Sequence, residues 1–280
     1  MSALEKNVKV STPGRICLFG EHQDYLNLPV IAAAISKRVK IVGTKKSGNK
    51  IFINLPDINK HEEFQLSEKI PYSKERDYLR SSVNLMLRNG FTFSSGFECE
   101  ITGKIPINTG TASSSALVVS WINFLARISD QEKILSNYEI AELAHESEVV
   151  EFSEPGGMMD HYSTALGGII YLKTFPKINV QKLNCNLGSF ILGNSEEPKN
   201  TTDILARVKN GVLNIASRLK QKYPDFDLQV LSDESLKNFE NDLNEQELKL
   251  LFATLRNKKI TQEAHSLMNS NKCDEEKFGI

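Results

Sequence analysis

The segment at residues 106–127, PINTGTASSSALVVSWINFLAR, constrains the fold of this chain more than any other. Its first half is small and polar, and its second half predicts a helix of about 13 residues that is apolar on nearly every side. Such a helix must be buried in a core. The 280 residues of the chain are enough to build that core as one large or two ordinary domains.

The order of the predicted elements indicates the fold class. Residues 7–55 read mostly as strands, because β-branched residues alternate around a Gly-containing turn. Further along, the patterns predict a helix at 75–89, a strand at 96–105, a helix at 138–151, and then a short helix that leads into a strand near 168–175. Strands and helices do not alternate regularly, which favours an α+β fold over a doubly wound parallel one.

The character of the chain changes near residue 176. One further strand is expected at 189–195, SFILGNS, and amphipathic stretches rich in Lys and Glu follow. These stretches cover 201–222, 234–241, 245–256 and 260–270. We therefore expect two domains, 1–175 and 176–280, without an internal repeat or a low-complexity linker.

Charge and cysteine content limit the possible partners. Lys and Arg total 34 against 35 Asp and Glu, so no basic excess points to nucleic acid, and no run approaches the roughly 20 apolar residues of a membrane span. The first residues do not resemble a signal peptide. Cys17, Cys99, Cys185 and Cys273 lie far apart without a CxxC pair, which argues for free thiols in a cytoplasmic protein and against a zinc site.

The small polar residues before the apolar helix are the first candidate site. Small side chains let a ligand approach the backbone, and a helix that begins near Ser113 offers free N–H groups and a partial positive charge to a phosphate. Serine hydroxyls can also bind Mg²⁺. Simple capping of the helix by serine is the alternative interpretation. The Walker A and G-x-G-x-x-G patterns are both absent.

Two further stretches contain polar groups in apolar surroundings. Asp160 follows Pro-Gly-Gly-Met-Met, where a buried carboxylate needs partners and could act as a general base or a metal ligand. Arg15 lies within an apolar strand and must be paired or face a site. Glu21, His22 and Asp24 then supply several acceptors and a donor, as recognition of a polyhydroxylated molecule requires. An exposed polar turn is the alternative.

Together the three stretches resemble one known family. PGRICLFGEHQDY resembles the galactokinase signature G-R-x-N-L-I-G-E-H-x-D-Y, and PINTGTASSSAL resembles the phosphate loop P-x-x-x-G-L-x-S-S-x-A of the GHMP kinases. PGGMMDHYSTALGG resembles the galactokinase stretch C-G-I-M-D-Q. The stretches occur in family order, and the resemblance covers essentially the whole chain. The chain thus resembles the GHMP kinases, which include galactokinase, homoserine kinase, mevalonate kinase and phosphomevalonate kinase.

The resemblance implies a fold and an activity. The expected fold is the two-domain α+β GHMP kinase fold, with an N-terminal ribosomal-protein-S5-like domain and an incomplete C-terminal ferredoxin-like α/β domain. The expected reaction transfers the γ-phosphate of ATP, with Mg²⁺, to a hydroxyl of a monosaccharide. The family implies the anomeric hydroxyl of galactose or a related sugar.

The family's functional residues carry over to matching positions of this chain. Arg15 and Asp160 match the catalytic pair, in which the carboxylate orients the attacking hydroxyl and accepts its proton. Glu21, His22, Asp24 and Gly157 match the sugar contacts. Ser114 and Glu148 match the metal ligands. The expected ATP-binding residues are Asn108, Thr109, Gly110, Thr111, Ala112, Ser113, Ser114 and Ser115.

Departures from the family pattern leave alternatives open. Cys17 replaces the signature asparagine, and Gly156 replaces the cysteine before the catalytic aspartate. These changes admit another acceptor, such as a uronic acid or mevalonate, or a non-catalytic sugar- and ATP-binding relative. A third, glycine-rich motif of the form G-A-x-x-T-G-x-G-x-G-G is absent from the 280 residues, so we expect weak or no activity from them. The sequence predicts no oligomeric state.

Overall fold

A computed structural model describes residues 7–107, 109–185, 187–193 and 201–270, with the side chains of 201–206 left out. The chain divides into two compact units. The first unit contains the described residues up to Ile16 together with Ala34–Glu154 and Asp160–Gly167, and the second contains Cys17–Ala33, Pro155–Met159 and the described residues from Gly168 onward. The expected domain boundary near residue 176 stays a prediction, because these units do not show which segments fold independently.

The first unit contains a mixed sheet. Its strands are β1 (Val8–Phe19), β2 (Val30–Lys46), β3 (Lys50–Leu55), β4 (Lys60–Gln65) and β5 (Gly96–Gly103), and β1 and β2 continue into the second unit. β3 pairs antiparallel with β4 and parallel with β5, while β5 pairs antiparallel with β2, from Val39 opposite Gly103 to Lys46 opposite Gly96. β1 also pairs with β2. Mixed pairing confirms the α+β class.

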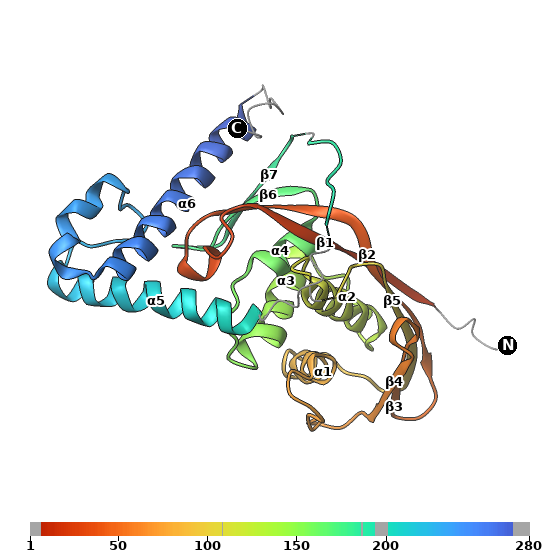
Figure 1. The fold of residues 1–280 in the computed structure, drawn as a ribbon. Helices are drawn as coiled ribbons and strands as arrows, with labels where there is room; N and C mark the ends of the chain where they lie inside the picture. The colour runs from red at the N-terminus through yellow and green to blue at the C-terminus, as the bar shows by residue number, and fades with distance from the viewer. Residues whose placement is uncertain (1–6, 108, 186, 194–200, 271–280) are drawn as a thin grey trace. The chain divides into compact units, whose positions relative to one another are not determined.

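The predicted apolar helix is the centre of this unit. The helices are α1 (Tyr78–Arg88), α2 (Ser113–Ile128), α3 (Asn137–His145) with a π-helical continuation η3 (Glu146–Val150), and α4 (Met159–Leu166). α2 packs against α1 and α3 (Figure 1). Trp121 and Phe124 of α2 are fully buried, their rings are stacked with centroids 5.5 Å apart, and the indole N–H of Trp121 donates to the Leu79 carbonyl.

A buried carboxylate begins α1. Asp77 is fully buried at the N-cap, where its side chain accepts hydrogen bonds from the backbone N–H of Arg80 and from the N–H and hydroxyl of Ser73, the latter two at 3.0 Å. The Arg80 guanidinium donates to the same carboxylate at 2.8 Å. The carboxylate therefore joins the residues before α1 to its first turn.

We expect Asp77→Asn to lower the free energy of unfolding by about 1–3 kcal/mol at pH 7, because an amide cannot accept all of these bonds. Burial raises the pKa of Asp77, but the bonds from Ser73 and the charge of Arg80 outweigh it, so the folded pKa lies below its ordinary value. The carboxylate thus stabilises the fold above the unfolded pKa of about 4, and this contribution is lost as the pH falls through the folded pKa. Urea unfolding should give a wild-type advantage that shrinks between pH 7 and pH 3; an advantage that grows in acid would contradict this account.

The second unit contains strands and a helical part. Residues 30–33 of β2 pair antiparallel with β6 (Ile169–Lys173), which pairs antiparallel with β7 (Asn179–Leu183). A 3-10 turn η1 (Asp24–Leu26) precedes β2, and another, η2 (Pro56–Ile58), lies in the first unit. The helical part contains α5 (Thr201–Lys222), the 3-10 segment η4 (Glu234–Asp242) and α6 (Glu245–Asn269), with η4 between the two long helices (Figure 1). None of the described helices is long and apolar enough to cross a membrane.

A buried lysine holds the loop before η4 against α6. Lys258 donates from Nζ to the carbonyls of Leu228, Gln229 and Leu231, and it is almost fully buried. Burial lowers the pKa of Lys258. The three carbonyls replace the water that a buried ammonium would lose.

Two predictions about the second half of the chain were wrong in part. A strand was expected at 189–195, but residues 189–193 do not form a strand, and Ile191 among them is 96% exposed. The last two residues of the expected strand, 194 and 195, lie outside the described residues. A strand needs a neighbour for its backbone hydrogen bonds, and 189–193 have none in the described chain. The stretches 245–256 and 260–270 form one helix, α6, because Asn257, Lys258 and Lys259 between them do not break it.

The cysteines also correct an expectation. Cys99 is free, as expected, whereas Cys185 is disulfide-bonded. Separation along the sequence does not exclude proximity in space, so the spacing argument could not detect this bond.

Candidate active site

An ion pair joins the two residues predicted as the catalytic pair. Arg15 on β1 donates from Nε and Nη2 to Oδ1 of Asp160 at 2.8 and 2.5 Å. Arg15 is buried, and the Asp160 side chain keeps 30% of its surface exposed. Asp160 lies in the first turn of α4, where the helix dipole also favours a carboxylate.

The two oxygens of Asp160 have different surroundings. Both Arg15 nitrogens bind Oδ1, and among the described residues Oδ2 accepts no hydrogen bond. The carboxylate is thus held in one orientation through one oxygen. The other oxygen can accept a proton from a bound hydroxyl, as a general base requires.

Arg15 also binds the loop that was predicted to hold phosphate. Its Nη1 donates to the Gly110 carbonyl at 2.6 Å, and its backbone N–H donates to the Thr111 carbonyl at 3.1 Å. Gly14, which precedes Arg15, also lies close to this loop. A Cβ built on Gly14 would be 2.9 Å from the same Thr111 carbonyl oxygen. One arginine therefore connects β1, the loop and α4.

The loop has an unusual backbone. Gly110 and Ala112 have φ values of 73° and 57°, and an alanine in the left-handed region is strained. Thr109 and Thr111 stabilise the loop, since their hydroxyls are 2.9 Å apart and each donates to the Pro106 carbonyl. Asn108, also predicted here, lies outside the described residues.

The start of α2 suits an anion. Ala112 is its N-cap and cannot cap it by a side chain, and the first turn contains no acidic residue. The N–H groups of Ser113, Ser114 and Ser115 therefore have no intrahelical partner, and the part of the chain that the structure describes gives them no side-chain cap. Of these serines, Ser114 is exposed and Ser115 is buried. This geometry favours the phosphate interpretation over simple serine capping.

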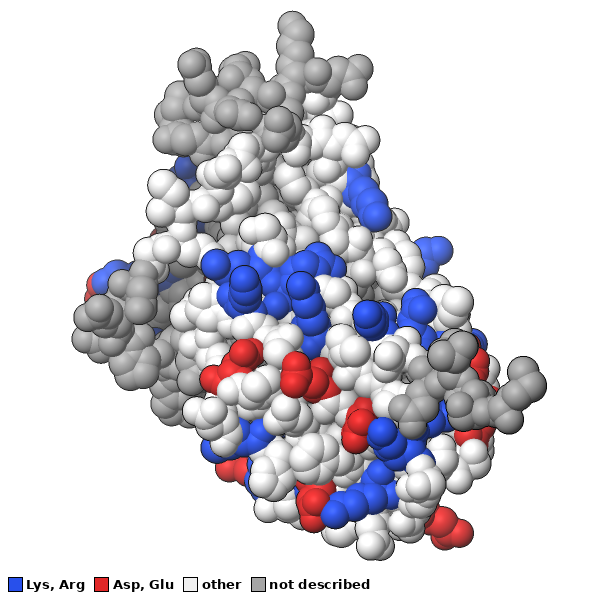
Figure 2. All heavy atoms as spheres, turned by 90° about the vertical axis from the view of Figure 1, so that its right-hand side faces the viewer, with Lys and Arg blue, Asp and Glu red and all other residues white. Residues whose placement is uncertain are grey.

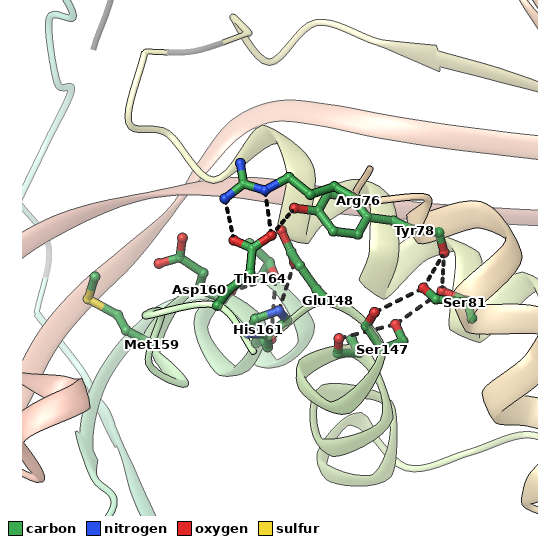
Figure 3. Close-up of polar contacts among 12 residues, drawn as sticks. Arg76, Tyr78, Ser81, Ser147, Glu148, Met159, Asp160, His161 and Thr164 are labelled. Atoms are coloured by element: carbon green, nitrogen blue, oxygen red, sulfur yellow. Dashed lines mark hydrogen bonds and ion pairs between the residues drawn. The ribbon is translucent and has the colours of Figure 1, made fainter. Parts of the chain in front are cut away.

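Glu148, the predicted metal ligand, is paired with a histidine. It lies in the π-helical segment η3, is buried, and its Oε2 is 2.8 Å from Nε2 of His161 (Figure 3). His161 is itself almost fully buried, and its Nδ1 has no hydrogen-bond partner among the described residues. π-helical turns frequently occur at functional sites.

The available donors suit a hard cation with few protein ligands. Among the described residues, no group of three or more His, Cys, Asp or Glu could form a metal site by itself. Glu148 and Ser114 would supply two oxygen ligands. Mg²⁺ is usually held by one or two protein oxygens together with substrate phosphates and water, so this donor set fits Mg²⁺.

A second polar cluster lies before the turn that leads to Asp160. It was not predicted from the sequence. Glu154 accepts hydrogen bonds from the Arg76 guanidinium and the Tyr78 hydroxyl, both at 2.8 Å (Figure 3). Burial raises the pKa of Glu154, while the Tyr78 bond and the Arg76 charge act in the opposite direction. Arg76 and Ser153 both have positive φ, so this contact joins two strained turns.

In the second unit, the structure brings two predicted sugar contacts together. Oδ2 of Asp24 accepts a hydrogen bond from the backbone N–H of Met159 at 2.9 Å. Gly157 lies so close to this carboxylate that a Cβ built on it would be 2.0 Å from Oδ2. Met159 directly precedes Asp160 in the chain, so Asp24 holds the backbone next to the predicted catalytic aspartate.

The other predicted sugar contacts lie on the turn before η1. Glu21 is exposed, and its carbonyl accepts a hydrogen bond from Asn257 of α6. His22 has a φ of 65°, and its ring centroid is 6.1 Å from that of Tyr25. Gln23, which was not predicted, is buried, donates to Thr261 and leaves its Oε1 without a partner among the described residues.

Family comparisons agree with the motifs. Residues 77–168 match the GHMP kinases N terminal domain, and residues 3–45 match the galactokinase galactose-binding signature. These two segments of the chain are thus similar to the GHMP kinases, and the first of them carries the galactokinase-type signature, as its motifs predicted.

Curated relatives include two kinds of kinase. Mevalonate kinase of Thermococcus sibiricus is 28% identical over 236 residues, which cover 77% of this chain and 68% of that protein. Mevalonate kinase of Pyrococcus furiosus is 31% identical over 59% of this chain and 51% of its own length. Galactokinase of Haemophilus influenzae is 30% identical over 57% of this chain and 42% of its own length. The chain thus spans between 42% and 68% of these relatives.

Solved structures confirm the fold. Lactococcus lactis galactokinase complexed with galactose has a TM-score of 0.76 at 19% identity, covering 94% of this chain and 70% of that one. Methanococcus jannaschii mevalonate kinase has a TM-score of 0.61 at 20% identity, covering 92% and 80%. The chain has the α+β GHMP kinase fold that its sequence predicted.

Proposed function

We propose that this chain transfers the γ-phosphate of ATP to a hydroxyl of a monosaccharide, with the anomeric hydroxyl of galactose or a related sugar as the acceptor. The observation that carries the proposal is the position of Arg15. It binds Asp160 through two nitrogens and the Gly110 carbonyl through a third. The base and the phosphate-binding loop are therefore held in one arrangement before any substrate binds, and such preorganisation lowers the barrier for transfer.

The proposed reaction uses these groups in simple roles. The acceptor oxygen attacks the γ-phosphorus, the bond from that phosphorus to the ADP oxygen breaks, and the hydroxyl proton passes to Oδ2 of Asp160. A loose transition state places charge on the phosphoryl oxygens, which the N–H groups at the start of α2 and the Arg15 guanidinium can offset. Proton transfer can be late in such a reaction, so an aspartate is a strong enough base.

Glu148 and Ser114 are the proposed protein ligands of Mg²⁺, which when bound neutralises charge on the phosphates. His161 orients Glu148 through the 2.8 Å contact between Nε2 and Oε2. Partners of this kind, one step removed from a metal, commonly change metal affinity when they are mutated.

We expect His161→Ala to weaken Mg²⁺-dependent ATP binding by about 10–100-fold, because Glu148 loses the group that orients it. The unfolding free energy should fall by about 1–3 kcal/mol, since a buried carboxylate is left without its partner. His161→Gln, whose amide can still donate to Glu148, should recover part of the binding. Titration with ATP, with and without Mg²⁺, tests this; equal loss with and without Mg²⁺ would assign His161 a purely structural role.

The proposed sugar contacts are Glu21, His22, Asp24 and Gly157 in the second unit. The galactokinase galactose-binding signature over residues 3–45 supports a sugar acceptor. Mevalonate is the second candidate, because the Thermococcus sibiricus mevalonate kinase aligns with 77% of this chain whereas the Haemophilus influenzae galactokinase aligns with 57%.

Isothermal titration separates these acceptors. The purified chain is titrated with a non-hydrolysable ATP analogue and Mg²⁺, and then with galactose, galacturonic acid, an amino sugar and mevalonate. Saturable nucleotide binding followed by preferred binding of one sugar would support the proposal. Preferred binding of mevalonate would identify mevalonate, and not a sugar, as the acceptor. Sugar binding without nucleotide binding would favour a non-catalytic relative.

A further inference from the structure

The first unit contains a cavity that the proposed function does not use. It has a volume of about 200 Å³ and is lined by residues of β1, β2, α2 and α3 and by the end of α4 through Gly167. None of the proposed catalytic, ATP-binding or sugar-binding residues lines it. Sites for drug-sized ligands have volumes of about 300–1,000 Å³, so this cavity suits a smaller molecule.

The cavity lining is rich in hydrogen-bonding groups. It includes the hydroxyl residues Ser11, Thr12 and Thr164, the amides Asn123 and Asn137, and the guanidinium residue Arg38. None of the described lining residues is acidic. One cation among neutral donors, without a carboxylate, favours an anionic ligand with further polar groups.

Arg38 is oriented by its neighbour on β1. Its Nε donates to the Ser11 hydroxyl and its Nη2 to the Ser11 carbonyl, each at 2.8 Å. These bonds fix the guanidinium plane and do not use Nη1. Among the described residues Arg38 forms no ion pair with a carboxylate, so its charge is available to an anion. A fixed, planar guanidinium is well suited to phosphate.

Two helices also contribute donors to the cavity lining. Oδ1 of Asn123 on α2 accepts a hydrogen bond from Arg127 at 2.8 Å, which leaves the amide NH₂ as the donor of Asn123. Asn137 is the first residue of α3, where backbone N–H groups have no intrahelical partner. Donors therefore lie on elements other than the strand that carries Arg38.

The surface charge near Arg38 also favours an anion. Lys37 and Lys40 on the same strand are exposed and form no ion pair among the described residues. On the face drawn in Figure 2, Lys and Arg side chains form a group near the centre and further groups elsewhere, with Asp and Glu side chains among them. A local excess of positive charge raises the rate at which small anions are captured.

We propose that this cavity binds a small phosphorylated metabolite. The phosphate pairs with Arg38, and the hydroxyl-bearing remainder of the ligand meets Asn123 and Asn137. This proposal goes beyond phosphoryl transfer, because the site shares no residue with the proposed catalytic and substrate-binding groups. The proposal is tested by ligand binding alone, so it does not depend on which acceptor the chain phosphorylates.

The test compares two variants of β2, each of which removes one positive charge. Arg38→Gln removes the cation of the cavity, and Lys40→Gln removes a cation that does not line it. Isothermal titration uses galactose 1-phosphate, glucose 6-phosphate and inorganic phosphate as probes, with galactose as the uncharged control. We expect saturable binding of a sugar phosphate by the wild type, about ten-fold or more weaker binding by Arg38→Gln, and less than about two-fold change for Lys40→Gln.

A second variant keeps the proposal testable if Arg38→Gln does not fold. Asn123→Asp keeps the shape and the bond from Arg127, but it removes the NH₂ donor and adds a negative charge, so it should also weaken sugar phosphate binding about ten-fold or more. Thermal unfolding checks that each variant is folded. Only binding that Arg38→Gln weakens is assigned to the cavity, because a sugar phosphate can also occupy the proposed active site. No binding to the wild type, binding that survives both substitutions, or sugar phosphate binding no tighter than that of inorganic phosphate would overturn the proposal.

Discussion

Asp160→Asn is expected to lower kcat for phosphoryl transfer by about 10²–10⁴-fold while leaving the fold and ATP binding nearly unchanged. The amide oxygen of asparagine can still accept the two hydrogen bonds that Arg15 donates to Oδ1. What is lost is Oδ2, which has no hydrogen-bond partner among the described residues and is the proposed proton acceptor. The change thus removes the base and keeps the structure around it. Initial rates of ADP formation at saturating ATP and sugar measure the effect.

Asp225→Asn is the matched control for this substitution. Asp225 is exposed in the second unit, so the same loss of charge should leave kcat within about two-fold. A titration with the ATP analogue shows whether the Asp160 variant still binds nucleotide. If Asp160→Asn retains more than about a tenth of the wild-type kcat, Asp160 does not act as the base and the proposed mechanism is wrong.

Gly157→Ala is expected to raise the KM for the sugar by about ten-fold or more. A Cβ at this position would lie 2.0 Å from Oδ2 of Asp24 and 2.3 Å from its Cγ, so the carboxylate must move. The same oxygen accepts the hydrogen bond from Met159, and that bond would be weakened or broken. A lost hydrogen bond to a charged group costs about 1.5–3 kcal/mol, which corresponds to roughly ten-fold or more in affinity.

Gly193→Ala provides the control for adding a methyl group. A Cβ on Gly193 would meet no atom of the described residues within 4 Å, and its backbone does not require a positive φ. Its sugar KM and kcat should remain at wild-type values. If Gly157→Ala leaves the sugar KM unchanged, Asp24 is not a sugar contact; if it raises the KM for ATP instead, the glycine serves the nucleotide.

Much of the first unit could be predicted from local sequence. An apolar helix preceded by small polar residues can be placed only in a core, and α2 is buried there. The pairing of Arg15 with Asp160 followed from the family motifs together with the cost of leaving either charge unpaired in apolar surroundings. The contact between Gly157 and Asp24 joins two of those motifs.

Other features depend on contacts between distant segments, which local patterns do not contain. His161 follows Asp160 directly, yet its partner Glu148 becomes apparent only when η3 and α4 pack together. The left-handed backbone of Ala112 could not be predicted, because alanine ordinarily avoids that region. Residues 189–193 have a strand-like composition, but a strand forms only where a neighbour pairs with it.

The fate of the labelled γ-phosphate in a single turnover tests the central claim most directly. The chain is used in excess over ATP labelled at the γ-phosphate, with Mg²⁺ and galactose, so that even slow transfer is visible, and the products are separated by chromatography. We predict that the label appears in a sugar phosphate, at a rate that falls about 10²–10⁴-fold with Asp160→Asn. Label that remains in ATP, that appears only as inorganic phosphate, or that reaches the sugar equally fast in the Asp160 variant would contradict the account.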